Sequence, residues 1–193
     1  MSENHVGGFN TSAIGFGWNE DVLRKKKLPA PRCWADQIDS RCKAEVETSN
    51  PGSSGTGHTM LAGLVQLMGE DAAFDYLKKL YRNATQYTRS GQARAKSVAK
   101  GEVGIGVSFT FGFENERQPG FRMVKSAAPC EGTSYEIGGI ALVKGSRNRE
   151  AARRYHDWLI SPAGQSIGAK ANSWQVPASK TCAHPGHRGR AAR

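Results

Sequence analysis

Apolar residues along this chain fall into short alternating runs and into longer runs with helical spacing, and the two kinds take turns. Alternation of apolar and polar positions is typical of half-buried strands, whereas recurrence every three or four residues is typical of amphipathic helices. The alternating runs predict strands over residues 13–18, 45–49, 103–109, 123–128 and 137–143.

Helical spacing and capping residues predict helices between these strands. Ser90, Asn148 and Ser161 stand where N-caps are expected, and Pro162 suits a first helical position. Gly101 follows an apolar stripe and is expected to end a helix. The predicted helices cover residues 20–27, 34–38, 55–68, 70–82, 90–100 and 148–159, with a short one from 161.

The alternating order of strands and helices predicts an α/β fold, in which helices cover both faces of a sheet. Ligands of such folds bind at the carboxyl ends of the strands. The turn at residues 49–56, which follows the predicted strand at 45–49, falls at such an end.

This turn reads Ser-Asn-Pro-Gly-Ser-Ser-Gly-Thr and leads into the predicted helix at 55–68. The first N–H groups of a helix lack internal partners and carry partial positive charge, so the corner suits an anion. Glycines allow close approach and hydroxyls add donors. An ordinary Ser/Thr cap is the alternative, because neither the P-loop nor the G-x-G-x-x-G pattern is matched. The candidate ligand-binding residues here are Ser53, Ser54, Gly55 and Thr56.

The net charge of the 193-residue chain is +10, which raises the question of a nucleic-acid partner. Part of this charge lies in the block at residues 24–27, and part lies in residues 180–193. Acids and bases are interspersed elsewhere, without the aromatic and basic strip of an RNA-binding sheet. The pattern favours a solvated basic surface, with no nucleic acid bound. A basic nucleic-acid-binding or interaction module is the alternative.

No run of about 18 apolar residues is present, so no membrane span is expected. The first residues lack the charged and apolar regions of a secretion signal, so no signal peptide is expected in the chain as written. Four cysteines stand without zinc-ligand spacing to one another. A Cys182-x-His184-x-x-His187 segment could hold a metal, but it lacks apolar periodicity, and neither a metal site nor a cofactor is predicted.

The sequence contains neither a G-x-S-x-G elbow nor an H-E-x-x-H pair, so no enzyme is predicted. Glu131 and Glu136 could suggest the paired carboxylates of a glycosidase, but no aromatic-lined cleft can be argued beside them. His58 and His156 lie on predicted helices and are expected at the surface or as capping residues.

Five blocks of the sequence, in order, resemble one family. They are Gly15–Asn19, Leu28–Asp36, Ser49–Thr56, Leu67–Asp71 and Ala128–Gly138. They look like blocks of the extracellular solute-binding proteins of bacterial ABC importers, in the ferric iron(III)-transporter group with type 2 periplasmic-binding-protein architecture. The resemblance implies two lobes that close over a solute, and delivery of that solute to a membrane permease by a periplasmic protein.

The resemblance also implies that much of the family fold is absent. Residues 1–130 are expected to form the second lobe, nearly complete, as a mixed sheet with flanking helices. Residues 131–179 are expected to be the hinge crossing and a remnant of a mostly missing first lobe, and residues 180–193 a disordered basic tail. Apolar side chains of the strand at 137–143 and of the helix at 148–159 should then be exposed.

The implied ligand depends on the segment after the strand at 103–109. Iron-binding members of the family carry a Tyr-Tyr pair there, and related members carry a His-Asp pair at the positions of Phe111 and Gly112. Both pairs are missing from this chain. The turn at 53–56 remains, together with Glu131 and Glu136 as further ligand-binding candidates. The resemblance therefore implies an anionic solute, either an iron(III) complex or a phosphorylated sugar or phosphate compound, and the residue chemistry favours an anionic ligand over bare iron.

The family-like blocks also imply a disulfide. Cys33 and Cys130 both lie inside such blocks, and an exported protein matures where disulfides persist. Cys42 and Cys182 lie outside the blocks and are expected to be unpaired.

Overall fold

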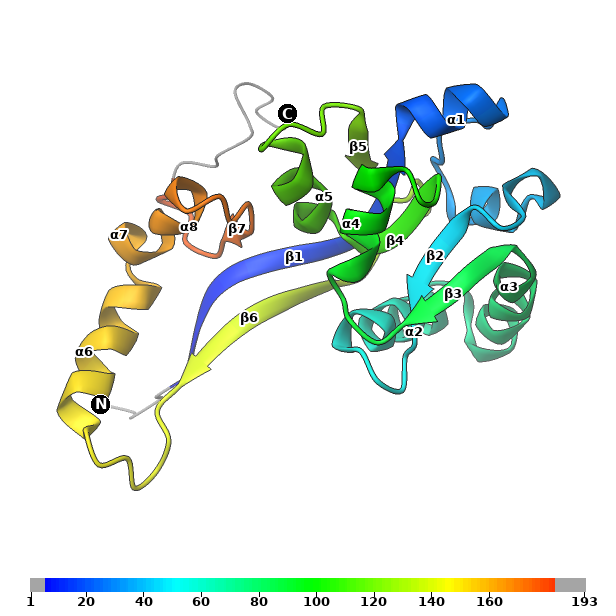
Figure 1. Cartoon of the computed structure of the whole chain (residues 1–193). Coiled ribbons are helices and arrows are strands. Elements are labelled where there is room, and N and C mark those ends of the chain that lie inside the picture. The colour runs from blue at the N-terminus through cyan, green and yellow to red at the C-terminus, as the bar shows by residue number, and fades with distance from the viewer. Residues whose placement is uncertain (1–5, 183–193) are drawn as a thin grey trace. The chain divides into compact units, whose positions relative to one another are not determined.

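The computed structural model describes residues 6–182 (Figure 1). Its strands are β1 (Val6–Asn19), β2 (Val46–Ser49), β3 (Ala84–Thr88), β4 (Ile105–Phe109), β5 (Val124–Ala127), β6 (Tyr135–Ala141) and β7 (Val176–Pro177). Its α-helices are α1 (Glu20–Lys26), α2 (Gly55–Met68), α3 (Glu70–Asn83), α4 (Ala93–Lys100), α5 (Thr110–Arg117), α6 (Arg149–Ile160), α7 (Pro162–Gln165) and α8 (Ile167–Lys170). Two 3₁₀ helices are η1 (Trp34–Ile38) and η2 (Ser40–Cys42). No helix among residues 6–182 combines the length and the apolar character that a membrane crossing requires.

The sheet is mixed, as the sequence predicts. Its main order is β3-β2-β4-β1-β5, and β6 and β7 also pair with β1. Strand β2 runs parallel to both β3 and β4, whereas β1 runs antiparallel to β4 and β5. The chain divides into a larger unit, Ala13–Tyr135, and a smaller unit, Met1–Ser12 with Glu136–Arg193. The expectation of a lobe over residues 1–130 and a remnant over 131–179 stays a prediction.

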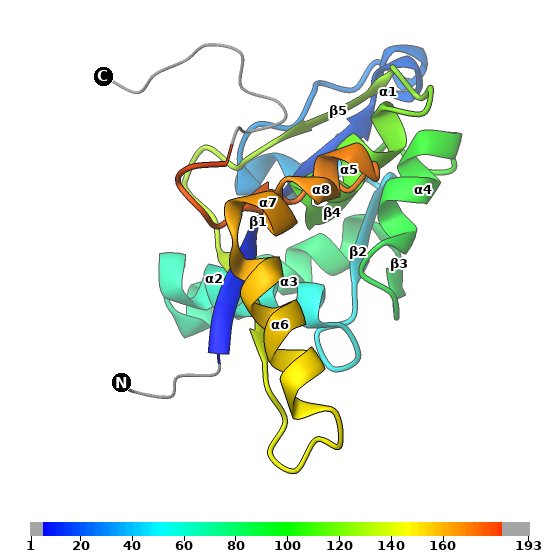
Figure 2. The ribbon, with the colours of Figure 1, turned by 90° about the vertical axis from the view of Figure 1, so that its left-hand side faces the viewer.

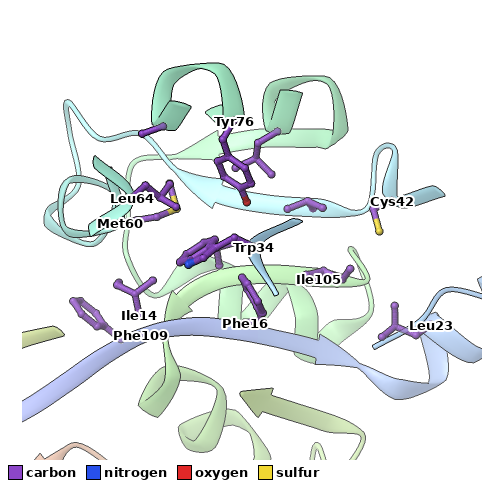
Figure 3. Close-up of a cluster of buried hydrophobic side chains, with 14 residues drawn as sticks. Ile14, Phe16, Leu23, Trp34, Cys42, Met60, Leu64, Tyr76, Ile105 and Phe109 are labelled. Carbon is purple, nitrogen blue, oxygen red and sulfur yellow. The ribbon is translucent and has the colours of Figure 1, made fainter. Parts of the chain in front are cut away.

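One face of the sheet in the larger unit carries the main hydrophobic core. Figure 3 shows the Trp34 ring beside Phe16 of β1 and below Tyr76 of α3. The ring centroids of Trp34 and Phe16 are 5.0 Å apart, and those of Trp34 and Tyr76 are 6.1 Å apart, both edge to face. Such aromatic pairs stabilise beyond the area they bury. Met60 and Leu64 of α2 complete this side of the core.

The opposite face of the same sheet carries a second core under α4 and α5. Phe113 of α5 is fully buried there with Val98 of α4. Gly17 of β1 and Gly106 of β4 are register partners, and both face the Phe113 ring. Because Phe16 and Gly17 are neighbours on β1, they point to opposite faces of the sheet. The prediction of helices on both faces is therefore confirmed.

Most predicted elements are present, and several were missed. The helix at 55–68 begins and ends where the sequence places it, and Ser161 caps α7 by accepting a hydrogen bond from the Gly164 N–H. Ser90 was predicted as the N-cap of the next helix, and this is wrong: α4 begins at Ala93, and Gln92 is its N-cap. The reason is that Arg94 binds the carbonyl oxygens of the preceding loop and holds it out of the helix. The sequence reading missed β3, β7, α5, α8 and η2.

A disulfide joins Cys33 to Cys130, as the family resemblance implied, and its Cα atoms are 4.8 Å apart. Cys42 and Cys182 are free thiols, as expected. The bridge links the start of η1 to the segment before β6. The Cys130 N–H also donates to the Arg32 carbonyl at 2.8 Å, so the two segments are joined by backbone as well as by sulfur.

The smaller unit exposes apolar side chains, as predicted for the strand at 137–143 and the helix at 148–159. Ile137 and Val143 are 59% and 78% exposed, and Tyr155 and Trp158 of α6 are 56% and 42% exposed. The expectation of a surface position holds for His58 but is wrong for His156, which is 5% exposed. The reason is that the His156 ring lies on the face of α6 that packs on the backbone at Gly7.

Replacing Gly17 by alanine should destabilise the protein, because an added Cβ would lie 2.1 Å from the buried Phe113 ring. Overpacking of this kind costs about 1–3 kcal/mol of unfolding free energy. Gly139→Ala is the matched control, since an added Cβ at this strand position meets its nearest atom only at 4.0 Å. Urea unfolding of both variants measures the difference. Equal stability of the Gly17→Ala variant and the wild type would contradict the packing described here.

Breaking the disulfide should lower the melting temperature. The bridge spans a sequence separation of 97 residues, and closing a loop of about 100 residues stabilises by roughly 4–5 kcal/mol in the chain-entropy model. Dithiothreitol should therefore destabilise the wild type and the Cys182→Ser variant alike. It should leave the melting temperature of a Cys33→Ser, Cys130→Ser double variant unchanged. A wild type that is indifferent to reduction would count against the bridge.

Candidate anion-binding site

Three strands of the larger unit end at the same edge of the sheet. Because β2 is parallel to β3 and to β4, their carboxyl ends meet there, and Ser49 of β2 lies opposite Thr88 of β3. The next α-helix after each of these strands is α2, α4 and α5, respectively. In Figure 1 the arrowheads of β2 and β3 point the same way, and α4 and α5 lie side by side in both views (Figure 2). The N-termini of three helices are therefore brought towards one edge.

The turn before α2 is held by its own backbone. The Asn50 carbonyl accepts hydrogen bonds from the Ser53 and Ser54 N–H groups at 3.2 and 3.0 Å. Ser54 occupies the N-cap position, but its side chain makes no capping hydrogen bond. An added Cβ at Gly55 would meet no atom within 4 Å. The first turn of α2 therefore has N–H groups that the Ser54 hydroxyl does not cap, and the side-chain position of Gly55 is open.

The loop between β3 and α4 packs against this turn. An added Cβ at Gly91 would lie 2.4 Å from the Thr56 hydroxyl oxygen, so only glycine permits this approach. The Ser108 hydroxyl at the end of β4 donates to the Gly91 carbonyl at 2.8 Å. The Gln92 side chain lies against Gly112 in the first turn of α5. These contacts connect the N-termini of α2, α4 and α5.

A buried arginine, which sequence reading missed, lies beneath this loop. Arg94 of α4 is 0% exposed. Its guanidinium donates to the Thr88 hydroxyl at 2.7 Å, to the Ser90 carbonyl at 2.9 Å and to the Ser108 hydroxyl at 3.2 Å, and also to the Gly91 carbonyl. Burial lowers the pKa of Arg94 to about 10, an effect that the charge of Glu47 opposes. The side chain is therefore charged at neutral pH.

An aromatic pair lies at the start of α5. The rings of Phe109 and Phe111 are stacked with centroids 6.0 Å apart, and the Phe111 side chain is half-buried. Gly112 beside it is buried and carries no side chain. This corner of the site therefore offers backbone N–H groups and an apolar ring, and neither phenolate nor carboxylate ligands for a metal.

Of the six candidate residues, the structure brings together Ser53, Ser54, Gly55 and Thr56. The Glu131 carboxylate instead accepts hydrogen bonds from the backbone N–H groups of Trp34 at 2.8 Å and Ala35 at 3.4 Å, and so caps η1. Glu136 belongs to the smaller unit and is exposed. The ligand-binding role of all six residues stays a prediction.

One group of metal-ligand type is found among residues 6–182, formed by Cys33, Cys130 and Glu131. Both sulfurs are bonded to each other, and the carboxylate is engaged at η1. The group therefore has a structural role, because the two cysteines form the disulfide and Glu131 caps η1.

The α/β larger unit, with helix N-termini at one edge of a mixed sheet, has the architecture of a lobe of type 2 periplasmic binding proteins. Residues 2–190 match the family described as bacterial extracellular solute-binding protein, and the chain belongs to this family. The family resemblance seen in the sequence is confirmed.

Two relatives and one solved structure are similar to this chain. A Haemophilus influenzae protein described only as uncharacterized is 41% identical over 168 residues, which are 86% of this chain and 48% of that protein. The phosphoglycerate transport regulatory protein PgtC of Salmonella typhimurium is 26% identical over 86% of this chain and 41% of its own length. The periplasmic binding protein AfuA from Actinobacillus pleuropneumoniae, solved with exogenous fructose-6-phosphate bound, is 35% identical with a TM-score of 0.88. That match covers 95% of this chain and 58% of AfuA. The chain thus spans about half the length of the curated relatives it matches.

Replacing Glu131 by alanine should lower the free energy of unfolding by about 1–2 kcal/mol, the usual effect of losing a carboxylate that caps a helix. The cause is the loss of the acceptor for the Trp34 N–H. Glu116→Ala is the control, because this half-exposed carboxylate on α5 makes no ion pair in the described chain. Thermal unfolding at pH 7 compares the two. A Glu131→Ala variant as stable as Glu116→Ala would refute the capping role.

Proposed function

We propose that this chain is the solute-capturing part of a bacterial ABC importer and that its solute is an organic phosphate. The observation that carries the proposal is the convergence of three helix N-termini, which the contacts of Gly91 with Thr56 and of Gln92 with Gly112 connect. Backbone N–H groups and the helix dipole favour a phosphate at such a corner. Membership of the solute-binding family supports a periplasmic protein that delivers its solute to a membrane permease.

The relatives support a phosphorylated solute. AfuA was solved with fructose-6-phosphate, and the name of PgtC refers to phosphoglycerate transport. Both are organic anions with a phosphate group, although the two carbon skeletons differ. The phosphate group, which the two ligands share, is the part that helix N-termini are suited to bind.

Ferric iron is the weaker proposal. A hard trivalent cation prefers oxygen anions as ligands, and the segment after β4 supplies Phe111 and Gly112 instead. The partial positive charge of the helix N-termini would also repel a bare cation. If the solute is an iron(III) complex, its anionic carrier and not the iron would contact the helix N-termini.

A basic nucleic-acid-binding module is less well supported. Within the basic block, Arg24 pairs with Asp21, and Lys26 pairs with Glu45. The ion pairs reduce the positive field of this surface, and the tail at 183–193 lies outside the described residues. The family match accounts for nearly the whole chain without this function.

The substitution Gly55→Leu should abolish binding of fructose 6-phosphate while leaving the fold intact. Its side chain would fill the open space over the first turn of α2, and leucine favours a helix more than glycine does. Isothermal titration with the wild type and the variant measures the effect, which we expect to exceed about tenfold in Kd, or roughly 1.4 kcal/mol.

The matched control is Gln66→Leu, an equally exposed position near the other end of α2. This variant should bind as the wild type does, and both variants should melt at or above the wild-type temperature. Wild-type protein that binds neither fructose 6-phosphate nor 3-phosphoglycerate would refute the proposal. So would equal affinity of the wild type and the Gly55→Leu variant.

A further inference from the structure

Arg94 is the largest fully buried side chain of the described chain, and it carries a charge. No carboxylate among residues 6–182 forms an ion pair with it. Glu47 is also buried and acts on Arg94 only through its charge, since its carboxylate accepts a hydrogen bond from Gln86. A buried cation without a paired anion is costly, because hydrogen bonds to neutral groups replace only part of its hydration.

The groups that Arg94 binds are neutral, and all belong to the edge of the sheet where the helices begin. They are the hydroxyls of Thr88 and Ser108 and the carbonyls of Ser90 and Gly91. The Nε–H group of Arg94 has no hydrogen-bond partner among residues 6–182. The guanidinium is therefore held in place by dipoles, and its charge is left incompletely compensated.

The same hydrogen bonds orient the loop between β3 and α4. The C=O and N–H groups of a trans peptide point in opposite directions. Because the carbonyls of Ser90 and Gly91 point at the guanidinium, the N–H groups of Gly91 and Gln92 point away from it, and the Gln92 N–H donates to the Ser90 hydroxyl at 3.4 Å. This loop lies against Thr56 of α2, so the arginine both directs donors and adds charge at the proposed site.

We propose that Arg94 is a positioning residue that acts as the buried counter-charge of the bound anion and makes the site prefer dianions over monoanions. This inference rests on the proposed function and deepens it, because it specifies the charge of the ligand group. The bound anion adds to the partial compensation that the charge of Glu47 gives to Arg94. A phosphate monoester, with a second pKa of about 6, is a dianion at pH 8, whereas a sulfate ester is a monoanion.

The test compares fructose 6-phosphate with fructose 6-sulfate at pH 8. Titrations followed by the amide NMR signals of Gly55 and Thr56 give both dissociation constants for the full chain. Wild-type protein should bind the phosphate more tightly. Arg94→Gln should reduce the ratio of the two affinities on the order of tenfold, the effect of one extra unit of ligand charge about 10 Å away at an effective dielectric constant near 20. Arg94→Lys keeps the charge and should keep the ratio within about twofold.

Lys100→Gln, which removes an exposed charge at the other end of the same helix, is the matched control and should leave both constants unchanged. A purely structural arginine predicts equal weakening of both ligands in Arg94→Gln, and that result would overturn the inference while the proposed function stands. If Arg94→Gln does not fold, the Arg94→Lys variant provides the test. This variant retains the charge, so loss of the preference for phosphate over sulfate in it would also overturn the inference. A wild type that binds neither ester refutes the proposed function and this inference together.

Discussion

Strand β2 pairs in parallel with β3 on one side and with β4 on the other, and this pairing constrains everything at the candidate site. Parallel neighbours end at the same edge of a sheet, so the next helix after each strand begins there. Ser49 and Thr88 are in register at that edge, and a slip by one residue would turn the side chains of β2 to the other face. The position of the candidate site is thus determined by the order and direction of the strands more than by any single residue.

The charges at this edge of the sheet bear on the proposed anionic solute. Each helix N-terminus carries roughly half a positive charge, and the edge gathers three of them above the guanidinium of Arg94. Hydroxyl groups, which dominate the turn before α2, would by themselves accept cations and anions alike. The helix N-termini and the buried cation add positive charge, which supports the proposal of an anionic solute. The half-buried ring of Phe111 adds an apolar surface at the start of α5.

Local sequence patterns predicted α2 and the turn before it. The features that the sequence did not predict depend on long-range contacts. Helix α2 has its own boundary signals, and the sequence places it at residues 55–68 as the structure does. Strand β3 is mostly polar and lies at the edge of the sheet, so it shows no apolar alternation. Arg94 lies between two alanines in a stretch rich in lysine, where an arginine is normally solvated, and only the fold buries it. Glu131 caps η1 across a sequence separation of 97 residues, a distance that no local pattern reports.

The two units differ in what stabilises them. Every buried hydrophobic residue among those described belongs to the larger unit, on one face of its sheet or the other. In the described part of the smaller unit, the buried polar side chains are Asn10, Ser12, His156 and Gln165, while large apolar side chains remain exposed. Burying such an apolar side chain is worth about 1.5–3 kcal/mol, and the smaller unit forgoes this at several positions. The hydrophobic stabilisation of the described chain therefore comes from the larger unit, and the three helix N-termini and Arg94 all belong to it. The candidate anion-binding site therefore depends on the hydrophobic core of the larger unit, to which the exposed apolar side chains of the smaller unit do not contribute.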